Sequence, residues 1–384
     1  MKQLFLASIA TLSVGIGLAL AGEPPAAAQE TTAPWVAPTP IVTGAPVSAM
    51  DESQDTTRVW AHADYLLWWL KNSPVPAPLL TSAGPPSSTG IIGQPGTQIL
   101  LGGSNVSTQE HSGGNFRIGT WIDSDNTLGV EGRYFFLGQK STTQTVISPT
   151  GAAPLAIPFL IPSVTPPSQQ AVRFTNPFGP QIGTLTIRQS LQDAEFNGLM
   201  NVASGSNLRL DLIGGFRFLE FDEDLAFGFS AVFPPPAPPN VIEATSFRTQ
   251  NQFYGGQLGA RGEYWMGKLF VNGTCLLALG DMHEVLNANQ VTFGFIPPAQ
   301  GRLTRDRLAY IPEGSINVGY QLTSWARVSA GYNILVANEM ARAGGSASEP
   351  ILTPASHGIV FPPPQLTSGS FWAQGLNLGL EIRY

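Results

Sequence analysis

Two short stretches of the sequence place an acid and a histidine at a spacing that suits general acid–base chemistry. His62-Ala63-Asp64 puts both polar side chains on one face of a strand, and Asp281-Met282-His283 does the same near a loop. A carboxylate and an imidazole side by side at the rim of a barrel are groups that a surface hydrolase would use. The motifs G-x-S-x-G, H-E-x-x-H and G-x-x-x-x-G-K-[ST] are absent from the sequence. We therefore expect that the protein is not an enzyme and has no catalytic residues, cofactor or metal site.

The composition limits the class of protein to which the chain can belong and the partners that it can bind. Charged residues make up 12% of the 384 residues, about half of the roughly 25% that is typical of soluble domains. The net charge of −7 argues against nucleic acid as a partner, because phosphate binding needs a basic surface. The single cysteine, Cys275, excludes an intramolecular disulfide and a multi-cysteine metal site.

A larger set of charged residues lies at alternate positions of segments whose other face is apolar. If these segments are strands of a closed barrel, the apolar face meets lipid and the charged face meets the lumen. Acids and bases are nearly balanced in this set, whereas a selective pore would show a bias of one sign. Two interpretations stay open, an internal salt-bridge network and the lining of a selective channel. The lumen-facing candidates are Glu131, Arg133, Asp193, Glu195, Arg209, Asp211, Arg217, Arg261, Glu263, Glu313, Arg327, Glu381 and Arg383.

The N-terminus has the features of a bacterial secretory signal peptide. Lys2 precedes an apolar stretch with small residues, and Ala19-Leu20-Ala21 offers a cleavage site. A transmembrane anchor is the alternative, but the stretch is short and polar residues interrupt it. We expect a signal peptide at 1–21, a flexible leader rich in Pro and Ala at 22–57, and the barrel at 58–384.

Beyond the leader, very short polar turns join pairs of alternating segments, and long connections rich in Pro, Gly, Ser and Thr separate the pairs. This alternation is typical of outer-membrane β-barrels, whose short turns face the periplasm. One opening strand, four hairpins and a closing strand predict an all-β, antiparallel up-and-down transmembrane barrel of ten strands. A further segment at 227–233 would raise the number to twelve. The predicted strands are 60–70, 115–123, 127–139, 184–202, 208–221, 247–265, 269–279, 308–320, 326–335 and 371–384, and the predicted long loops are 71–112, 140–183, 222–246, 284–304 and 336–370.

The sequence ends on an alternating strand whose apolar face runs to the last residue. A closed barrel has no free edge, so its last strand must pair with its first. A polar residue, a glycine and two apolar or aromatic positions at the end of the chain resemble the assembly signal that the barrel-insertion machinery recognises. In this sequence those positions are Asn377, Gly379, Ile382 and Tyr384.

Aromatic residues near the ends of the predicted strands indicate girdles at the two membrane interfaces. They are Tyr65, Trp68, Trp69, Tyr134, Trp265, Tyr320, Trp325 and Tyr384.

Five stretches, read together, resemble a bacterial family of outer-membrane β-barrel porins of the BBP7 type. They are 60–69 (WAHADYLLWW), 93–97 (GQPGT), 215–219 (GFRFL), 251–257 (NQFYGGQ) and 371–376 (FWAQGL), and the resemblance extends over about residues 58–384. It implies a barrel in the bacterial outer membrane and brings no catalytic residues.

Together these observations predict a porin that lets small hydrophilic solutes diffuse passively, with outer-membrane lipid and the barrel-insertion machinery as partners. Two alternatives stay open. One is a closed structural or surface-interaction barrel that acts through its long outer loops, and the other is an outer-membrane hydrolase with a site at the rim.

Overall fold

A computed structural model describes residues 58–83, 89–149, 153–174, 179–232, 240–292, 299–353, 358–360 and 362–384. The expected signal peptide at 1–21 and leader at 22–57 lie outside the described residues. The described part of the chain contains no helix that is both long and apolar enough to cross a membrane.

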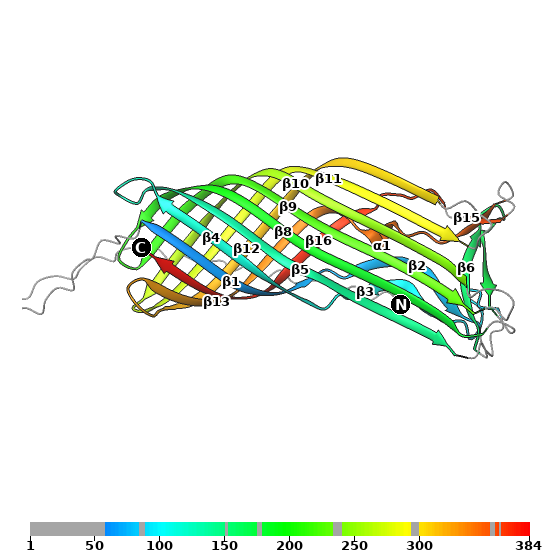
Figure 1. Cartoon of the computed structure of the whole chain (residues 1–384). Coiled ribbons are helices and arrows are strands. Elements are labelled where there is room, and N and C mark those ends of the chain that lie inside the picture. Colours follow the sequence, from blue (N-terminus) through cyan, green and yellow to red (C-terminus); the bar gives the residue numbers. More distant parts are fainter. Residues whose placement is uncertain are drawn as a thin grey trace, which may run out of the picture. The chain divides into compact units, whose positions relative to one another are not determined.

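Ten antiparallel strands close into a barrel, in which nearly every neighbour in space is also the next barrel strand along the chain (Figure 1). The ring closes where the first strand pairs with the last, from Trp60 opposite Arg383 to Leu70 opposite Ala373. The prediction of a ten-stranded up-and-down barrel is confirmed, and the twelve-stranded alternative is wrong. The barrel strands are β1 (Val59–Leu70), β4 (Glu110–Trp121), β5 (Leu128–Ser148), β8 (Gln181–Ser204), β9 (Leu208–Ala231), β10 (Asn240–Met266), β11 (Leu269–Thr292), β12 (Ala299–Gln321), β13 (Ala326–Ala341) and β16 (Ser368–Arg383).

Alternation along the strands separates a lipid-facing wall from the lumen. In β16, Leu378 and Ile382 are exposed on the outside, whereas Asn377 and Glu381, which directly precede them, are buried inside. Successive side chains of a strand point to opposite faces, so this period of two sends apolar groups outward and polar groups inward. Closure also gives every strand a partner on both sides, which a bilayer demands of any spanning backbone.

Tight turns join the hairpins at the end of the barrel where β1 begins and β16 ends. The turn between β4 and β5 is held by the Asp123 carboxylate, which accepts hydrogen bonds from the backbone N–H groups of Thr127 and Leu128. These bonds favour the ionised carboxylate and lower the pKa of Asp123. The turn between β10 and β11 contains Gly267 at φ +68°, a left-handed conformation that favours glycine.

At the opposite end, the stretches predicted as long loops contain much more regular structure than expected. Strands β5 and β9 to β12 continue far into them, so that residues 227–231 extend β9 instead of forming an extra strand. A second, smaller sheet also forms there, in the order β15-β14-β6-β2-β3 with β7 beside β6. Its strands are β2 (Ser73–Ser82), β3 (Ile99–Val106), β6 (Leu155–Ile161), β7 (Ser168–Arg173), β14 (Ile351–Thr353) and β15 (Gly358–Val360).

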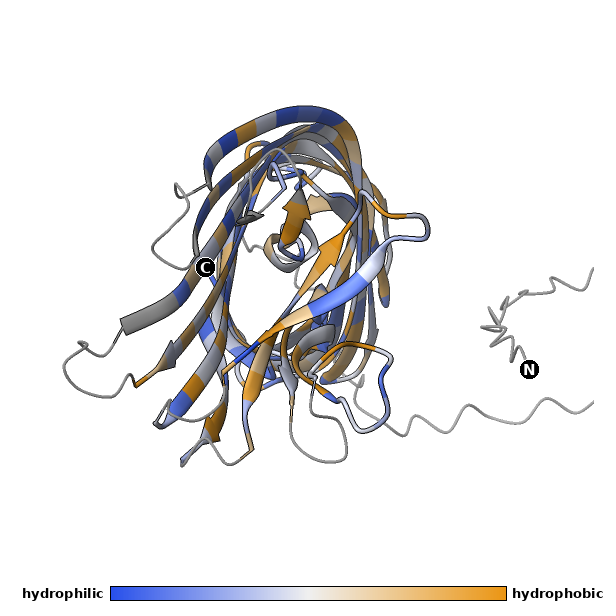
Figure 2. Ribbon diagram, turned by 90° about the vertical axis from the view of Figure 1, so that its right-hand side faces the viewer, coloured by the Kyte–Doolittle hydropathy of each residue, from blue (hydrophilic) through white to orange (hydrophobic). Residues whose placement is uncertain are grey.

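Part of this second sheet and the short helix α1 (Ala343–Ser346) lie inside the ring of barrel strands, as the view along the barrel shows (Figure 2). Helix α1 packs closely on β2, and a Cβ added to Gly344 would lie 2.2 Å from the backbone oxygen of Pro74. Only glycine allows this approach, so the sequence seats α1 directly against β2.

The outer surface carries the predicted aromatic residues, with two exceptions. Tyr65, Trp69 and Tyr134 are exposed on the wall, as are Tyr320, Trp325 and Tyr384 near the short turns. Trp265 is half-buried and lies on the same face of β10 as the inward-facing Glu263, so its assignment to a girdle is wrong. Trp68 was predicted to join a girdle and this is wrong, because it is 0% exposed and points into the lumen with Leu66 and Leu70.

Candidate functional site

The lumen is the site that the sequence singled out, and strand β9 shows how it is filled. From the short-turn end outward, the inward-facing residues of β9 are first charged, at Asp211 and Arg217, and then apolar, at Leu219 and Phe221. Buried Glu223 comes next, followed by a second apolar run at Leu225, Phe227 and Phe229. The lumen therefore consists of ionic and apolar layers stacked along the barrel axis.

The centre of the ionic layer is a cluster of two arginines and three acids from four strands. Arg217 is 0% exposed and lies 2.6 Å from both Asp193 and Glu313. Arg133 lies 2.8 Å from Glu195 and 2.7 Å from Glu313, so Glu313 bridges the two guanidinium groups. Opposite charges at these distances, away from water, fix one another's positions.

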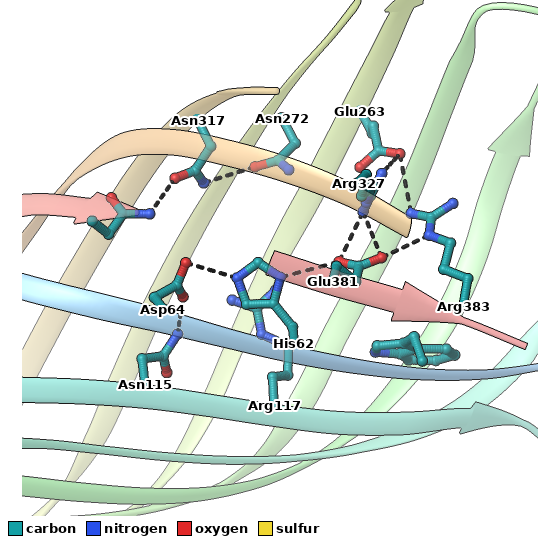
Figure 3. A network of polar contacts seen from close by, with 12 residues as sticks. His62, Asp64, Asn115, Arg117, Glu263, Asn272, Asn317, Arg327, Glu381 and Arg383 are labelled. Atoms are coloured by element: carbon teal, nitrogen blue, oxygen red, sulfur yellow. Dashed lines mark hydrogen bonds and ion pairs between the residues drawn. The ribbon is translucent and has the colours of Figure 1, made fainter. Parts of the chain in front are cut away.

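A second group of ion pairs lies nearer the short turns. Arg327 on β13 lies 2.6 Å from Glu263 on β10 and 2.9 Å from Glu381 on β16. Arg383 contacts the same two acids, at 3.3 Å and 2.6 Å (Figure 3). Glu381 and Arg327 are cross-strand neighbours on β16 and β13, whereas Glu263 on β10 is three strands away from β13 around the ring. The two ion pairs to Glu263 therefore cross the lumen and join separate parts of the wall.

His62 takes part in this network of ion pairs. Its Nε2 lies 2.8 Å from Asp64 and its Nδ1 lies 3.3 Å from Glu381 (Figure 3). The second oxygen of Asp64 accepts a hydrogen bond of 2.6 Å from the amide of Asn115. All three groups are enclosed in the lumen, so His62 and Asp64 have a structural explanation.

Every predicted lumen residue faces inward and takes part in an ion pair. Glu131, Asp193, Glu195, Asp211, Arg217, Glu263, Glu313, Arg327 and Glu381 are buried, and Arg133, Arg209, Arg261 and Arg383 are half-buried. Arg261 pairs with Glu131 at 2.7 Å, and Arg209 pairs with Asp211 at 3.0 Å. Of the two interpretations that the sequence left open, this arrangement favours the internal salt-bridge network.

Cavities among these side chains are small. One of about 60 Å³ lies between Trp60, Trp121 and the arginines near the short turns, and one of about 40 Å³ lies beside His62 and Asn115. Cavities of this size, measured as the space open to the centre of a water molecule, hold a few waters at about 10–15 Å³ each.

Above the ionic layer, a cluster of buried apolar side chains fills the lumen. The tilted rings of Trp68 and Phe135 have a centroid distance of 5.4 Å. Those of Phe221 and Phe371, which come from different parts of the ring of strands, have a centroid distance of 4.5 Å. Leucine, alanine and methionine residues from β1, β5, β8, β11, β12, β13 and β16 complete the cluster. This layer was not predicted from the sequence, because inward-facing apolar residues were not separated from lipid-facing ones. Alternation along β1 and β9 does distinguish the two faces.

The next layer holds an ion pair that the sequence did not suggest. Arg342, directly before α1, donates to Glu223 Oε2 through Nε at 3.0 Å and Nη2 at 2.7 Å. Gln189 also donates to Oε2 at 2.7 Å, and Ser73 at the start of β2 donates to Oε1 at 3.0 Å. Glu223 thus connects the barrel wall to both segments that enter the lumen.

The outermost layer is again apolar and includes the second sheet. Val75 and Leu80 of β2 are buried against inward-facing Ile187, Phe229 and Leu286 of the wall. At the edge of this layer Glu243 on β10 is buried opposite Phe229, and burial raises its pKa to about 8. Within the described residues burial is the main influence on this carboxyl, and no basic side chain acts on it.

Other predicted residues lie outside the lumen. Asp281 and His283 are on the outer face of β11, and His283 Nδ1 lies 2.5 Å from the Asp306 carboxylate. Across the described ranges, no group of three or more His, Cys, Asp or Glu residues is arranged to hold a metal ion.

The proposed assembly positions occupy distinct places at the end of β16. Asn377 is buried and donates to the Asn317 side chain at 2.7 Å. Gly379 leaves room for Asp64, which a Cβ would meet at 2.2 Å, while Ile382 and Tyr384 are exposed on the outside. Their recognition by insertion machinery stays a prediction.

Comparison with solved structures gives other outer-membrane barrels at low similarity. The outer-membrane protease OmpT from Escherichia coli is 11% identical with a TM-score of 0.46, over 85% of this chain and 97% of that one. The toluene transporter TbuX from Ralstonia pickettii is 6% identical with a TM-score of 0.19, over 84% of this chain and 89% of that one. None of the curated proteins compared with the chain matches it.

A family model matches the described barrel almost from end to end, over residues 60–294 and 297–384. The family is described as putative beta barrel porin-7. The closed barrel with its apolar outer wall and this match place the protein in the bacterial outer membrane. The chain belongs to the beta barrel porin-7 (BBP7) family.

Proposed function

We propose that this protein is an outer-membrane barrel whose lumen is closed at rest and whose working surface is the sheet and rim at its outer end. The observation that carries the proposal is the apolar layer across the lumen, where Trp68, Phe135, Phe221, Phe253 and Phe371 are all 0% exposed. A hydrophilic solute would have to lose its water shell to cross this layer, with no polar group to replace it.

Electrical conductance tests this proposal directly. The purified full-length protein, folded in detergent, is inserted into a planar bilayer under a fixed voltage. The expected result is a baseline current without steady open steps, because the ionic and apolar layers fill the path. A steady, ohmic open current from the unmodified protein would contradict the proposal.

Passive diffusion of small hydrophilic solutes is the second candidate function, and it requires the inner segments to move. Two observations favour it: the family is one of porins, and the outer half of the lumen is filled by β2 and α1, which are separate from the wall. Side-chain bonds centred on Glu223 hold both segments. A channel of this kind would open when those bonds are broken, whereas a permanent scaffold would stay closed.

A catalytic role is not part of the proposal. Asp281 and His283 lie on the outer face of β11, where His283 contacts Asp306. A hydrolytic activity of the purified protein that is lost in His283→Ala would support the third alternative, a rim-site hydrolase.

A further inference from the structure

The barrel wall has a notch on one side of its outer half. Strands β1 and β4 have 12 residues each, whereas β5 has 21 and β16 has 16. Pairing of β1 with β16 stops at Leu70 opposite Ala373, and pairing of β1 with β4 stops at Trp69 opposite Glu110. Beyond this level, the first residues of β16 pair with β13 alone.

A cleft of about 460 Å³ lies at this notch, where the chain leaves β1 and enters the lumen as β2. This volume is within the range of about 300–1,000 Å³ that is usual for small-molecule sites. Asn72, Asn105, Thr367 and Ser370 are exposed around it, and the base includes Gly345 of α1. Lys71, Arg342 and Trp372 complete the polar and aromatic lining.

The cleft carries a net positive charge. Arg342 is neutralised by Glu223, but the Lys71 ammonium donates only to neutral acceptors, the backbone oxygen of Ser370 at 2.7 Å and its Oγ at 2.9 Å. No carboxylate lines the cleft, and within the described residues the hydrogen bonds of the Lys71 ammonium go to Ser370 alone. An ammonium group has three donors, so one N–H of Lys71 stays available for an anion.

The height of the cleft on the barrel matches the headgroup region of the outer leaflet. On β16, the exposed residues Leu376, Leu378 and Leu380 form the lipid-facing wall below it. Trp372 lies at the cleft itself, and Trp69 on the neighbouring strand is exposed at nearly the same level. Tryptophan favours the membrane–water interface, so the cleft opens where acyl chains end and headgroups begin.

These groups suit a phosphate carried on a sugar. The ammonium of Lys71 binds a phosphate oxygen as a point charge, and the amides and hydroxyls around the rim both donate to and accept from sugar hydroxyls. We propose that the cleft binds a phosphorylated sugar presented by the headgroup of an outer-leaflet glycolipid. A soluble sugar phosphate has the same chemistry, so the test must distinguish the two sources.

Binding is measured on the full-length protein in detergent with three probes: bis-phosphorylated lipid A, the same lipid after phosphatase treatment, and glucose 6-phosphate. Lys71→Ala is expected to weaken lipid A binding at least tenfold. Lys140→Ala is the matched control, because this lysine also lies on the outer half of the barrel but not in the cleft. Dephosphorylated lipid A is expected to bind the unmodified protein at least tenfold more weakly.

A second variant keeps the test decisive if Lys71→Ala fails to fold. Gly369 lines the cleft, and a Cβ built on it meets no atom within 4 Å, so Gly369→Leu adds bulk to the cleft without a clash. It is expected to reduce lipid A binding with the charges unchanged. Equal binding by the unmodified protein, Lys71→Ala and Gly369→Leu would overturn the proposal. Glucose 6-phosphate binding as tight as that of lipid A would overturn the lipid source.

Discussion

The buried ion pair between Glu223 and Arg342 offers the sharpest test of how the lumen is held closed. Arg342→Met keeps the apolar stem of the side chain and removes both charge-assisted bonds to Glu223. It also removes the bonds of 3.2 Å from Nη2 to the backbone oxygens of Lys71 and Asn72. The chain between β1 and β2 and the chain before α1 therefore lose the side chain that joins them to each other and to Glu223.

The expected loss of stability depends on the environment in which Arg342→Met leaves the Glu223 carboxylate. Glu223 is 0% exposed, and without Arg342 its carboxylate keeps only neutral donors, chiefly Gln189 and Ser73. Removing one member of a buried ion pair typically costs about 3–5 kcal/mol, because the remaining charge is buried without compensation. The double variant Glu223→Gln/Arg342→Met removes both charges, so its loss should be about 1–2 kcal/mol.

Two measurements check this prediction. Urea unfolding in lipid vesicles gives the free energies of unfolding of Arg342→Met, Glu223→Gln and the double variant, and hence the coupling between the two residues. Bilayer recordings show whether Arg342→Met passes current that the unmodified protein does not. The reasoning is refuted if Arg342→Met unfolds within about 0.5 kcal/mol of the unmodified protein, or if the double variant loses the sum of the two single variants.

Three other predictions concern separate parts of the barrel. Arg217→Ala should lower the free energy of unfolding in vesicles by about 3–5 kcal/mol, because it leaves buried carboxylates without their basic partner. The exposed control Arg248→Ala should change it by about 1 kcal/mol or less. Glu243 has a pKa raised from 4.5 to about 8, so its contribution to stability is full below about pH 4.5 and is lost as the pH rises to about 8. Glu243→Gln should therefore unfold with a weaker dependence on pH between 5 and 9, and parallel pH profiles would contradict the assignment. Deletion of Tyr384 should lower outer-membrane insertion in a fractionation blot, since its backbone N–H bonds to Val59 and its oxygen accepts from Arg58; undiminished levels would count against the assembly signal.

The strand number and the inward set of charges could be predicted because both rest on local patterns. Alternation with a period of two assigns each residue to a face, and short polar turns fix where one strand ends and the next begins. Arg209 and Asp211 on β9 illustrate this, since their alternation with Leu208, Leu210 and Leu212 placed them inside before any contact was known.

The filling of the outer half could not be predicted in the same way. Residues 71–112 and 336–370 are rich in Pro, Gly and Ser, which are typical of loops, and only their contacts with the wall decide that β2 and α1 enter the lumen. The Glu223–Arg342 ion pair joins residues 119 positions apart, so no local pattern could indicate it. Trp68 was misplaced because aromatic residues near a strand end suit both an interface and a core.

The unequal lengths of the strands have a geometric consequence. A transmembrane strand tilted by about 45° uses about 9–11 residues, so the 27 residues of β10 leave about 16 that continue past the bilayer. At about 3.3 Å per residue and the same tilt, they lift the far rim about 35–40 Å above the lipid. The side formed by β1 and β4 has no such extension, so the wall of the barrel is much higher above the membrane on one side than on the other. The tall side therefore extends beyond the reach of the lipid headgroups, while the low side ends at the level of the membrane.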